Sequence, residues 1–243
     1  MKVKKVSILG RNGFIGSALS ERFKNVYNYP RKDVDFLFFF ASPSSQILFN
    51  YANDWCYDET VDGFINALEF CADNNIKLIY PSSGTVYESN GSYSEAKLEL
   101  EHIQKQHKYK NVLGFRIFAG YGPGEAHKGE YASVVYQFCK RMKEGLSPVI
   151  YGDGTQTRDF VYIDDILDGI IGNLDKTGVM DIGSGISTSF NEVVKTINDL
   201  LQEKITPTYI KAPQNYLIDT TCPNPISCQV SLKEGVKRIL ESL

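Results

Sequence analysis

A glycine-rich turn near the amino terminus constrains the fold more than any other feature of the chain. The apolar run at 6–9 ends at Gly10, Gly13 and Gly16 follow at three-residue spacing, and residues 17–23 then have helical spacing. Glycine lets the backbone approach a pyrophosphate, whose charge the following helix amino terminus stabilises. We therefore predict a dinucleotide cofactor bound at the turn residues Gly10, Arg11, Asn12, Gly13, Phe14, Ile15 and Gly16.

Strand-like and helix-like segments alternate after this turn, which predicts an α/β fold with right-handed crossovers. The fold class we expect is a Rossmann-like doubly wound parallel sheet with a smaller carboxy-terminal lobe. The boundary is placed at residue 124, where the pattern becomes less regular, and a crossing of the chain between the lobes is left open. The expected strands are 34–41, 77–80, 112–118 and 179–182, and the expected helices are 61–74, 93–106, 131–144, a helix from Asp164, and 232–243.

Composition excludes several classes of function. The formal charge of −3 provides no field for gathering nucleic acid or an anionic membrane, so neither is an expected partner. The longest apolar run, 36–41, is far too short to cross a bilayer, and we expect a cytoplasmic protein. The five cysteines are scattered without metal-ligand spacing, so we predict buried free thiols and no metal site.

The choice between NAD and NADP stays open at this stage. The acidic residue that usually binds a ribose 2′-hydroxyl is absent from the stretch 28–32, where Arg31 stands instead. Arg31 and Arg11 could meet a 2′-phosphate, although for either arginine taken singly a solvated surface charge is the better interpretation. Ala41, which ends the apolar run at 34–41, is included among the predicted cofactor-binding residues.

Ser83, Tyr93 and Lys97 form a candidate catalytic set. Tyr93 and Lys97 are four residues apart, which places a phenol and an ammonium on one face of the predicted helix. A nearby cation favours the phenolate and lowers the pKa of the tyrosine. Ser83 and Thr85 follow the strand at 77–80, so their hydroxyls would lie at the carboxyl end of the sheet, where ligands bind in open α/β folds.

These segments together resemble the NAD-dependent epimerase/dehydratase family, the extended short-chain dehydrogenases that act on nucleotide sugars. The resemblance implies NAD or NADP in an amino-terminal lobe of residues 1–124 and a nucleoside-diphosphate sugar held by a substrate-binding lobe of residues 125–243. It also implies that Arg158 contacts the substrate diphosphate, and it leads us to expect a homodimer. The segments that carry it are the glycine turn, 83–87, Tyr93 with Lys97, Arg116 with 121–124, 151–165, 180–185 and 230–235.

The chain also departs from the family's pattern. Only about ten residues lie between the second strand and the run at 34–41, where members have a further helix and strand, and only five separate Tyr87 from Tyr93. Gly84 and Thr85 stand where dehydratases carry an acidic pair. We therefore predict a nucleotide-sugar epimerase that works by transient oxidation of a sugar hydroxyl and hydride return. The alternatives are an NADPH-dependent 4-keto nucleotide-sugar reductase and a non-catalytic dinucleotide sensor.

Overall fold

The computed structural model describes residues 4–88, 91–212 and 216–243. The chain divides into two compact units. The first unit contains the residues up to Ile117 together with Leu167–Met180, and the second contains Phe118–Ile166 and Asp181–Leu243. The chain thus crosses between units. The functional division at residue 124 stays a prediction.

The first unit is built on a six-stranded sheet in the order β2-β1-β3-β4-β5-β9. The pairs β1–β2, β1–β3, β3–β4 and β4–β5 are parallel. This order and these helical crossovers confirm the predicted Rossmann-like α/β fold. The strands are β1 (Lys5–Leu9), β2 (Asn25–Tyr27), β3 (Phe36–Phe39), β4 (Lys77–Ser83), β5 (Val112–Ile117) and β9 (Gly178–Ile182).

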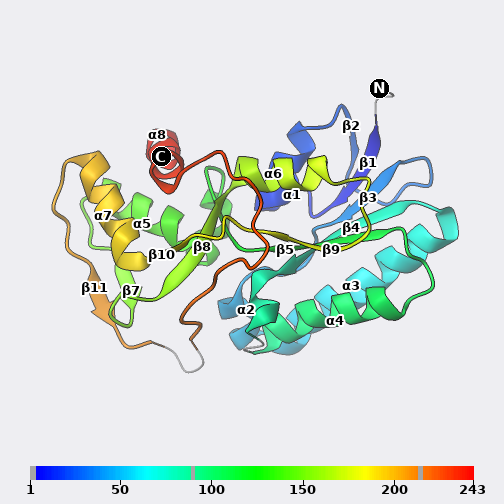
Figure 1. Ribbon diagram of the computed structural model, residues 1–243, viewed down its shortest axis with the longest axis horizontal. Coiled ribbons are helices and arrows are strands. Elements are labelled where there is room, and N and C mark those ends of the chain that lie inside the picture. The colour runs from blue at the N-terminus through cyan, green and yellow to red at the C-terminus, as the bar shows by residue number, and fades with distance from the viewer. Residues whose placement is uncertain (1–3, 89–90, 213–215) are drawn as a thin grey trace. The chain divides into compact units, whose positions relative to one another are not determined.

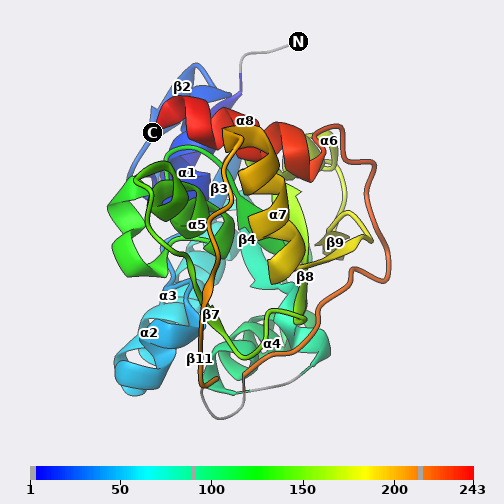
Figure 2. The same ribbon diagram turned by 90° about the vertical axis from the view of Figure 1, so that its left-hand side faces the viewer.

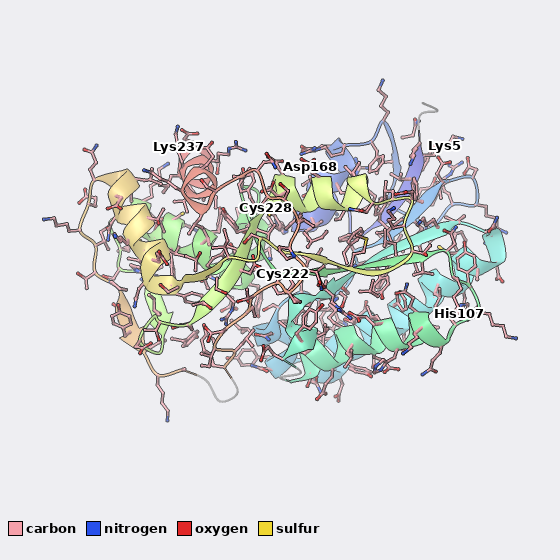
Figure 3. All side chains as sticks on the ribbon, viewed as in Figure 1. Lys5, His107, Asp168, Cys222, Cys228 and Lys237 are labelled. Carbon is pink, nitrogen blue, oxygen red and sulfur yellow. The ribbon has the colours of Figure 1, made fainter. Side chains whose placement is uncertain are left out.

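Helices cover both faces of this sheet, as Figures 1 and 2 show: α1 and α6 lie over one face, and α3 and α4 over the other. An ion pair of 3.2 Å between Arg22 and Asp168 joins the α1 side to α6, and Figure 3 labels Asp168 there. The helices are α1 (Phe14–Glu21), α2 (Gln46–Tyr51), α3 (Asn53–Asn74), α4 (Ser92–Gln106) and α6 (Ile163–Gly172), with a 3-10 turn η1 (Gly84–Tyr87).

The core of the first unit lies between the sheet and α3 with α4. All four residues of β3 are buried, as expected for a strand covered on both faces. Phe64 of α3 lies 4.7 Å from Tyr80 of β4 and 6.2 Å from Phe39 of β3 between ring centroids. Helix α3 ends where Asn75 adopts a left-handed conformation, φ 54°. Aromatic packing therefore holds the helical layer against the strands.

The described residues of the second unit form two small sheets, three α-helices and a 3-10 helix. One sheet has the order β10-β8-β6 and the other pairs β11 with β7. Buried Asp159 accepts the backbone N–H groups of Ser184, Gly185 and Cys222, so one carboxylate connects β8 to two loops. The elements are β6 (Ala119–Tyr121), η2 (Ala126–Tyr131), α5 (Val134–Lys143), β7 (Val149–Tyr151), β8 (Thr157–Tyr162), β10 (Ser187–Ser189), α7 (Phe190–Leu201), β11 (Thr208–Ile210) and α8 (Leu232–Ser242).

The predicted strands and helices are all present, with shifted ends. The largest shift is in α3, which begins at Asn53 and not at residue 61. The short connection before 34–41 has a clear consequence, because β3 pairs directly with β1 and no further helix stands between β2 and β3. Helix α7, which has 12 residues, and short elements such as α2 and β10 were not predicted.

The five cysteines are free thiols, and four of them are buried. Burial raises the pKa of both Cys222 and Cys228, which Figure 3 labels, to about 11. Within the described ranges, no three potential metal ligands gather into a group. None of the helices described there is long and apolar enough to cross a bilayer.

Candidate active site

The glycine turn joins β1 to α1 in a conformation that other residues would disrupt. Gly10 has φ +85°, and a Cβ there would lie 2.4 Å from the carbonyl carbon of Phe40. A Cβ on Gly16 would lie 2.1 Å from the Gly10 carbonyl oxygen. Gly13 begins α1 without a side-chain cap, and the first turn of the helix carries no acidic residue. The backbone N–H groups of this helix end therefore suit an anion.

We expect Gly16→Ala to lower dinucleotide affinity at least tenfold and to destabilise the protein by about 2 kcal/mol, because the added methyl overlaps backbone that cannot swing away. Isothermal titration with the dinucleotide and thermal unfolding measure the two effects. Gly172→Ala is the matched control, since a Cβ there meets nothing within 4 Å. Equal behaviour of the two variants would show that the turn does not need its glycine.

Ser83 and Thr85 lie together where β4 passes into η1. The Thr85 hydroxyl donates to Ser83 Oγ at 3.0 Å, and the Thr85 backbone N–H donates to the same atom at 3.2 Å. Because Ser83 Oγ accepts twice, its own hydrogen is left to be donated to a third group. Ser83 is 5% exposed and is hydrogen-bonded to Tyr93.

Tyr93 lies in the first turn of α4 and is partly buried. Its ring meets Phe49 of α2 edge-on, with ring centroids 5.4 Å apart. Burial raises the pKa of the Tyr93 phenol, and the hydrogen bond with Ser83 partly offsets this rise. A hydroxyl donor stabilises a phenolate. The structure thus brings Ser83, Thr85 and Tyr93 together, as the sequence predicts.

Lys97 lies one turn further along α4, with 2% of its surface exposed. Its Nζ donates to Ser42 Oγ at 2.7 Å and lies 5.8 Å from the centroid of the Tyr93 ring. Burial lowers the pKa of Lys97 to about 7. The ammonium is therefore close to Tyr93, but its hydrogen bond goes to Ser42, and Lys97 does not contribute to the pKa shift of Tyr93 in this structure.

The remaining predicted cofactor residues of the first unit separate into two groups. Arg11 and Asn12 are exposed in the turn, and Ala41 follows the peptide against which Gly10 packs. Arg31 instead makes a bidentate pair with Asp33, at 2.7 Å and 3.0 Å. The Asp33 carboxylate also pairs with Lys5, which begins β1, whereas the glycine turn follows the last residue of that strand. The Arg31 guanidinium is thus engaged by Asp33, and it also lies 4.3 Å from the centroid of the Tyr27 ring.

Arg158 lies on β8 of the second unit, with its guanidinium largely buried. Its Nη1 donates to the Thr157 and Ile218 carbonyls at 2.7 Å and 3.0 Å, and its Nη2 donates to the Leu217 carbonyl at 2.8 Å. The alternative of an ion pair with Asp159 or Asp165 is not observed among the described residues. Burial lowers the pKa of Arg158. A buried guanidinium held by neutral carbonyls keeps its charge available to an anion.

Comparison with known proteins identifies the family. The model of the NAD dependent epimerase/dehydratase family matches residues 27–183. The chain belongs to this family. The match includes Ser83, Tyr93, Lys97 and Arg158, and it begins after the glycine turn. Membership confirms the resemblance inferred from the sequence motifs.

Two curated proteins are similar to part of the chain. The ADP-L-glycero-D-manno-heptose-6-epimerase of Brachyspira hyodysenteriae is 32% identical over 158 residues, which are 56% of this chain and 50% of that protein. The enzyme of the same name from Cupriavidus pinatubonensis is 31% identical over 176 residues, 62% of this chain and 51% of that protein. The chain spans about half the length of these curated relatives.

Solved structures of other proteins share the fold. A UDP-N-acetylglucosamine 4-epimerase from Methanobrevibacter ruminantium, in complex with UDP-N-acetylmuramic acid, has a TM-score of 0.87 at 23% identity, covering 100% of both chains. A UDP-glucose 4-epimerase from Thermus thermophilus, in complex with NAD, has a TM-score of 0.84 at 19% identity, covering 98% of both chains. At these identities the likeness establishes the fold alone.

Two residues of the site were missed by sequence reasoning. Ser42, which accepts the hydrogen bond of Lys97, follows the predicted strand at 34–41 without a motif of its own. Phe49 lies on α2, a helix of six residues that is too short to show an apolar period. The only available signal was position, since Ser42 directly follows the predicted cofactor residue Ala41.

Proposed function

We propose that the protein is an NAD-dependent nucleotide-sugar epimerase. The observation that carries this proposal is the joining of Ser83, Thr85 and Tyr93 by hydrogen bonds, with Lys97 one turn away on the same helix. This arrangement can remove a proton from a sugar hydroxyl and return it. Membership of the NAD dependent epimerase/dehydratase family and the names of the curated relatives support it.

The glycine turn fits a dinucleotide. A side chain at Gly10 would overlap the Phe40–Ala41 peptide, and a side chain at Gly16 would overlap the Gly10 carbonyl. The amino terminus of α1 has no side-chain cap, so its N–H groups are available to a pyrophosphate. Arg31 is neutralised by Asp33, which favours NAD over a cofactor with a 2′-phosphate. A nicotinamide dinucleotide held at this turn would supply the hydride acceptor and donor that the epimerisation requires.

Each residue of the set has a distinct part in the reaction. Tyr93, as the phenolate, takes the proton of the sugar hydroxyl and later returns it. Ser83 donates a hydrogen bond and, with Thr85, orients the oxygen that loses its proton. Lys97, when protonated, favours the phenolate and holds the cofactor ribose. Turning of the keto sugar between hydride removal and return inverts the carbon.

Arg158 is assigned to the substrate diphosphate, and the second unit to substrate binding. We expect Arg158→Met to raise KM for the nucleotide sugar about 10- to 100-fold with kcat little changed, because one charge-assisted contact is lost from ground state and transition state alike. Steady-state kinetics measure this. Arg158→Lys keeps the positive charge but lacks the planar guanidinium, so it shows which of the two the diphosphate contact requires.

Arg141→Met is the control for Arg158, because Arg141 is exposed and its Nε donates only to the Ser147 carbonyl. A fall in kcat at unchanged KM in Arg158→Met would contradict the diphosphate assignment.

The dimer implied by family resemblance also stays a proposal, and its expected helices correspond to α3 and α4.

The proposal is tested by incubating the purified protein with ADP-, UDP-, GDP- and dTDP-sugars and resolving the products by NMR. Inversion of one sugar carbon without net consumption of cofactor is the expected result. The cofactor released by heat denaturation separates the epimerase from the reductase. Retained NAD fits an internal redox cycle, whereas an empty site that binds NADPH reversibly fits a reductase. Absence of inversion with every sugar would reject the epimerase.

A further inference from the structure

Helix α4 is fixed along strand β4 by three side-chain hydrogen bonds in antiparallel order. The bonds of Tyr80 with Gln104 and of Ser82 with Glu101 measure 2.5 Å each. The third bond joins the candidate catalytic hydroxyls of Ser83 and Tyr93. Such a ladder sets how far the helix can slide along the strand. From the amino to the carboxyl end of β4, the pairs are Tyr80 with Gln104, Ser82 with Glu101, and Ser83 with Tyr93.

The middle pair of this ladder is reinforced by a partly buried ion pair. Arg116 of β5 donates from Nε to Glu101 Oε1 at 2.9 Å and from Nη2 to Oε2 at 2.6 Å. Its Nη1 donates to the Tyr87 hydroxyl at 2.7 Å, and its guanidinium lies 4.8 Å from the centroid of that ring. Glu101 is 8% exposed, and Arg116 has a raised pKa because of Glu101. One guanidinium is therefore joined to α4 and to η1.

We infer that the pair of Glu101 and Arg116 positions Tyr93 against Ser83 for proton transfer, an inference that rests on the proposed function. Arg116 holds α4, which carries Tyr93 and Lys97, and it holds Tyr87, which ends the turn that begins after Ser83. The two segments that must meet in the reaction thus share one anchor. Glu101 and Arg116 act through Tyr93 and do not touch the reacting atoms.

The geometry of a helix explains why such an anchor matters. Glu101 lies eight residues beyond Tyr93, on the same face as Lys97. A slide of one residue along the helix axis moves Tyr93 by about 1.5 Å. A hydroxyl pair tolerates only about 2.5–3.0 Å between oxygens, so a shift of this size breaks the bond between Tyr93 and Ser83. Misplacement by about 1 Å can lower a rate about 100-fold.

A purely structural role is a poor explanation for this pair. Apolar side chains of similar volume hold buried surfaces together as well as a buried ion pair does, and often better. They impose no direction, however, whereas a bidentate guanidinium fixes the position of the carboxylate. The directional contacts of Glu101 and Arg116 therefore fix the position of α4 along β4. The distance between Tyr93 and Ser83 depends on that position.

The test uses Glu101→Gln, which keeps the side-chain volume, and Arg116→Lys, which keeps the charge but cannot reach both partners. Both are expected to lower kcat about 10- to 100-fold with KM changed less than about threefold, since substrate contacts are untouched. Tyr109→Phe is the matched control, because it removes a hydrogen bond of 2.7 Å to the Ile76 carbonyl, before the amino end of β4. Thermal unfolding verifies that each variant is folded.

A second readout does not depend on turnover. The protein has 15 tyrosines, so tyrosine ring-carbon NMR with Tyr93→Phe for assignment follows the titration of Tyr93 alone. Weakening the Ser83 bond is expected to raise the pKa of Tyr93 in Glu101→Gln and in Arg116→Lys, and not in Tyr109→Phe. If the wild type turns over no sugar, the proposed function fails while a raised Tyr93 pKa still supports the positioning role. An unchanged titration, or changes no larger than those of Tyr109→Phe, overturns it.

Discussion

Replacing Tyr93 by Phe is expected to lower turnover at least 100-fold and up to about 10,000-fold, while leaving cofactor binding nearly intact. The substitution removes only the hydroxyl that exchanges a proton with the sugar, and one positioned proton-transfer group contributes an effect of this size. The ring remains, so the edge-on contact with Phe49, at 5.4 Å between centroids, is kept. Steady-state rates with the sugar that the wild type inverts give the first quantity, and titration with NAD gives the second.

Tyr57→Phe is the appropriate control for Tyr93→Phe. Tyr57 packs against the same cluster as Tyr93, which includes Phe49 and Cys56, but it belongs to α3 and has no part in the proposed reaction. It should retain wild-type turnover and stability within experimental error. If Tyr93→Phe also kept wild-type turnover, catalysis through this phenol would be wrong, and a non-catalytic dinucleotide sensor would become the better account of the chain.

The glycine turn and the pair of Tyr93 and Lys97 were predictable because each depends on local chemistry. A turn between strand and helix that requires Gly10 and Gly16 is visible in the spacing alone, and the close approaches of the backbone bear it out. Two residues four apart on a helix necessarily share a face. Their common surroundings, by contrast, come from elsewhere in the chain: Ser42 is 55 residues before Lys97 in sequence.

The charged residues were harder to predict, since a sequence does not say which partner a charge will meet. For Arg31 the sequence left open a contact with a 2′-phosphate or a solvated surface charge, and the structure pairs it with Asp33 only two residues away. For Arg158, Asp159 and Asp165 were the alternative partners. Both carboxylates instead accept backbone N–H groups, which compete successfully because buried loops must satisfy their donors. Glu101 and Arg116, 15 residues apart, could be paired only once α4 was seen against β5.

Replacing Lys97 by Met is expected to stabilise the cofactor-free protein while it lowers activity. Burial lowers the pKa of Lys97 from 10.5 to about 7, so below pH 7 the folded state holds a buried ammonium that the unfolded chain exposes to water. The difference between these two pKa values corresponds to a destabilisation of the folded state of at most about 5 kcal/mol. It is fully present below pH 7, declines as the pH rises from 7 to 10.5, and is absent above that range. Met, which is apolar and of similar length, removes this cost, although Ser42 loses its donor.

Denaturant unfolding at pH 6 and at pH 10 measures this effect: the gain from Lys97→Met should be several kcal/mol at pH 6 and should nearly vanish at pH 10. Turnover should fall in the same variant, and the rising limb of its pH–rate profile should move to higher pH. The reason is that burial raises the pKa of Tyr93, and a protonated Lys97 is the nearby side-chain charge able to lower it when the cofactor is bound. Lys105→Met, an exposed lysine in the last turn of α4, provides the control. An unchanged rate with an unchanged pH profile would mean that Lys97 is a buried structural lysine and that Tyr93 ionises without its help.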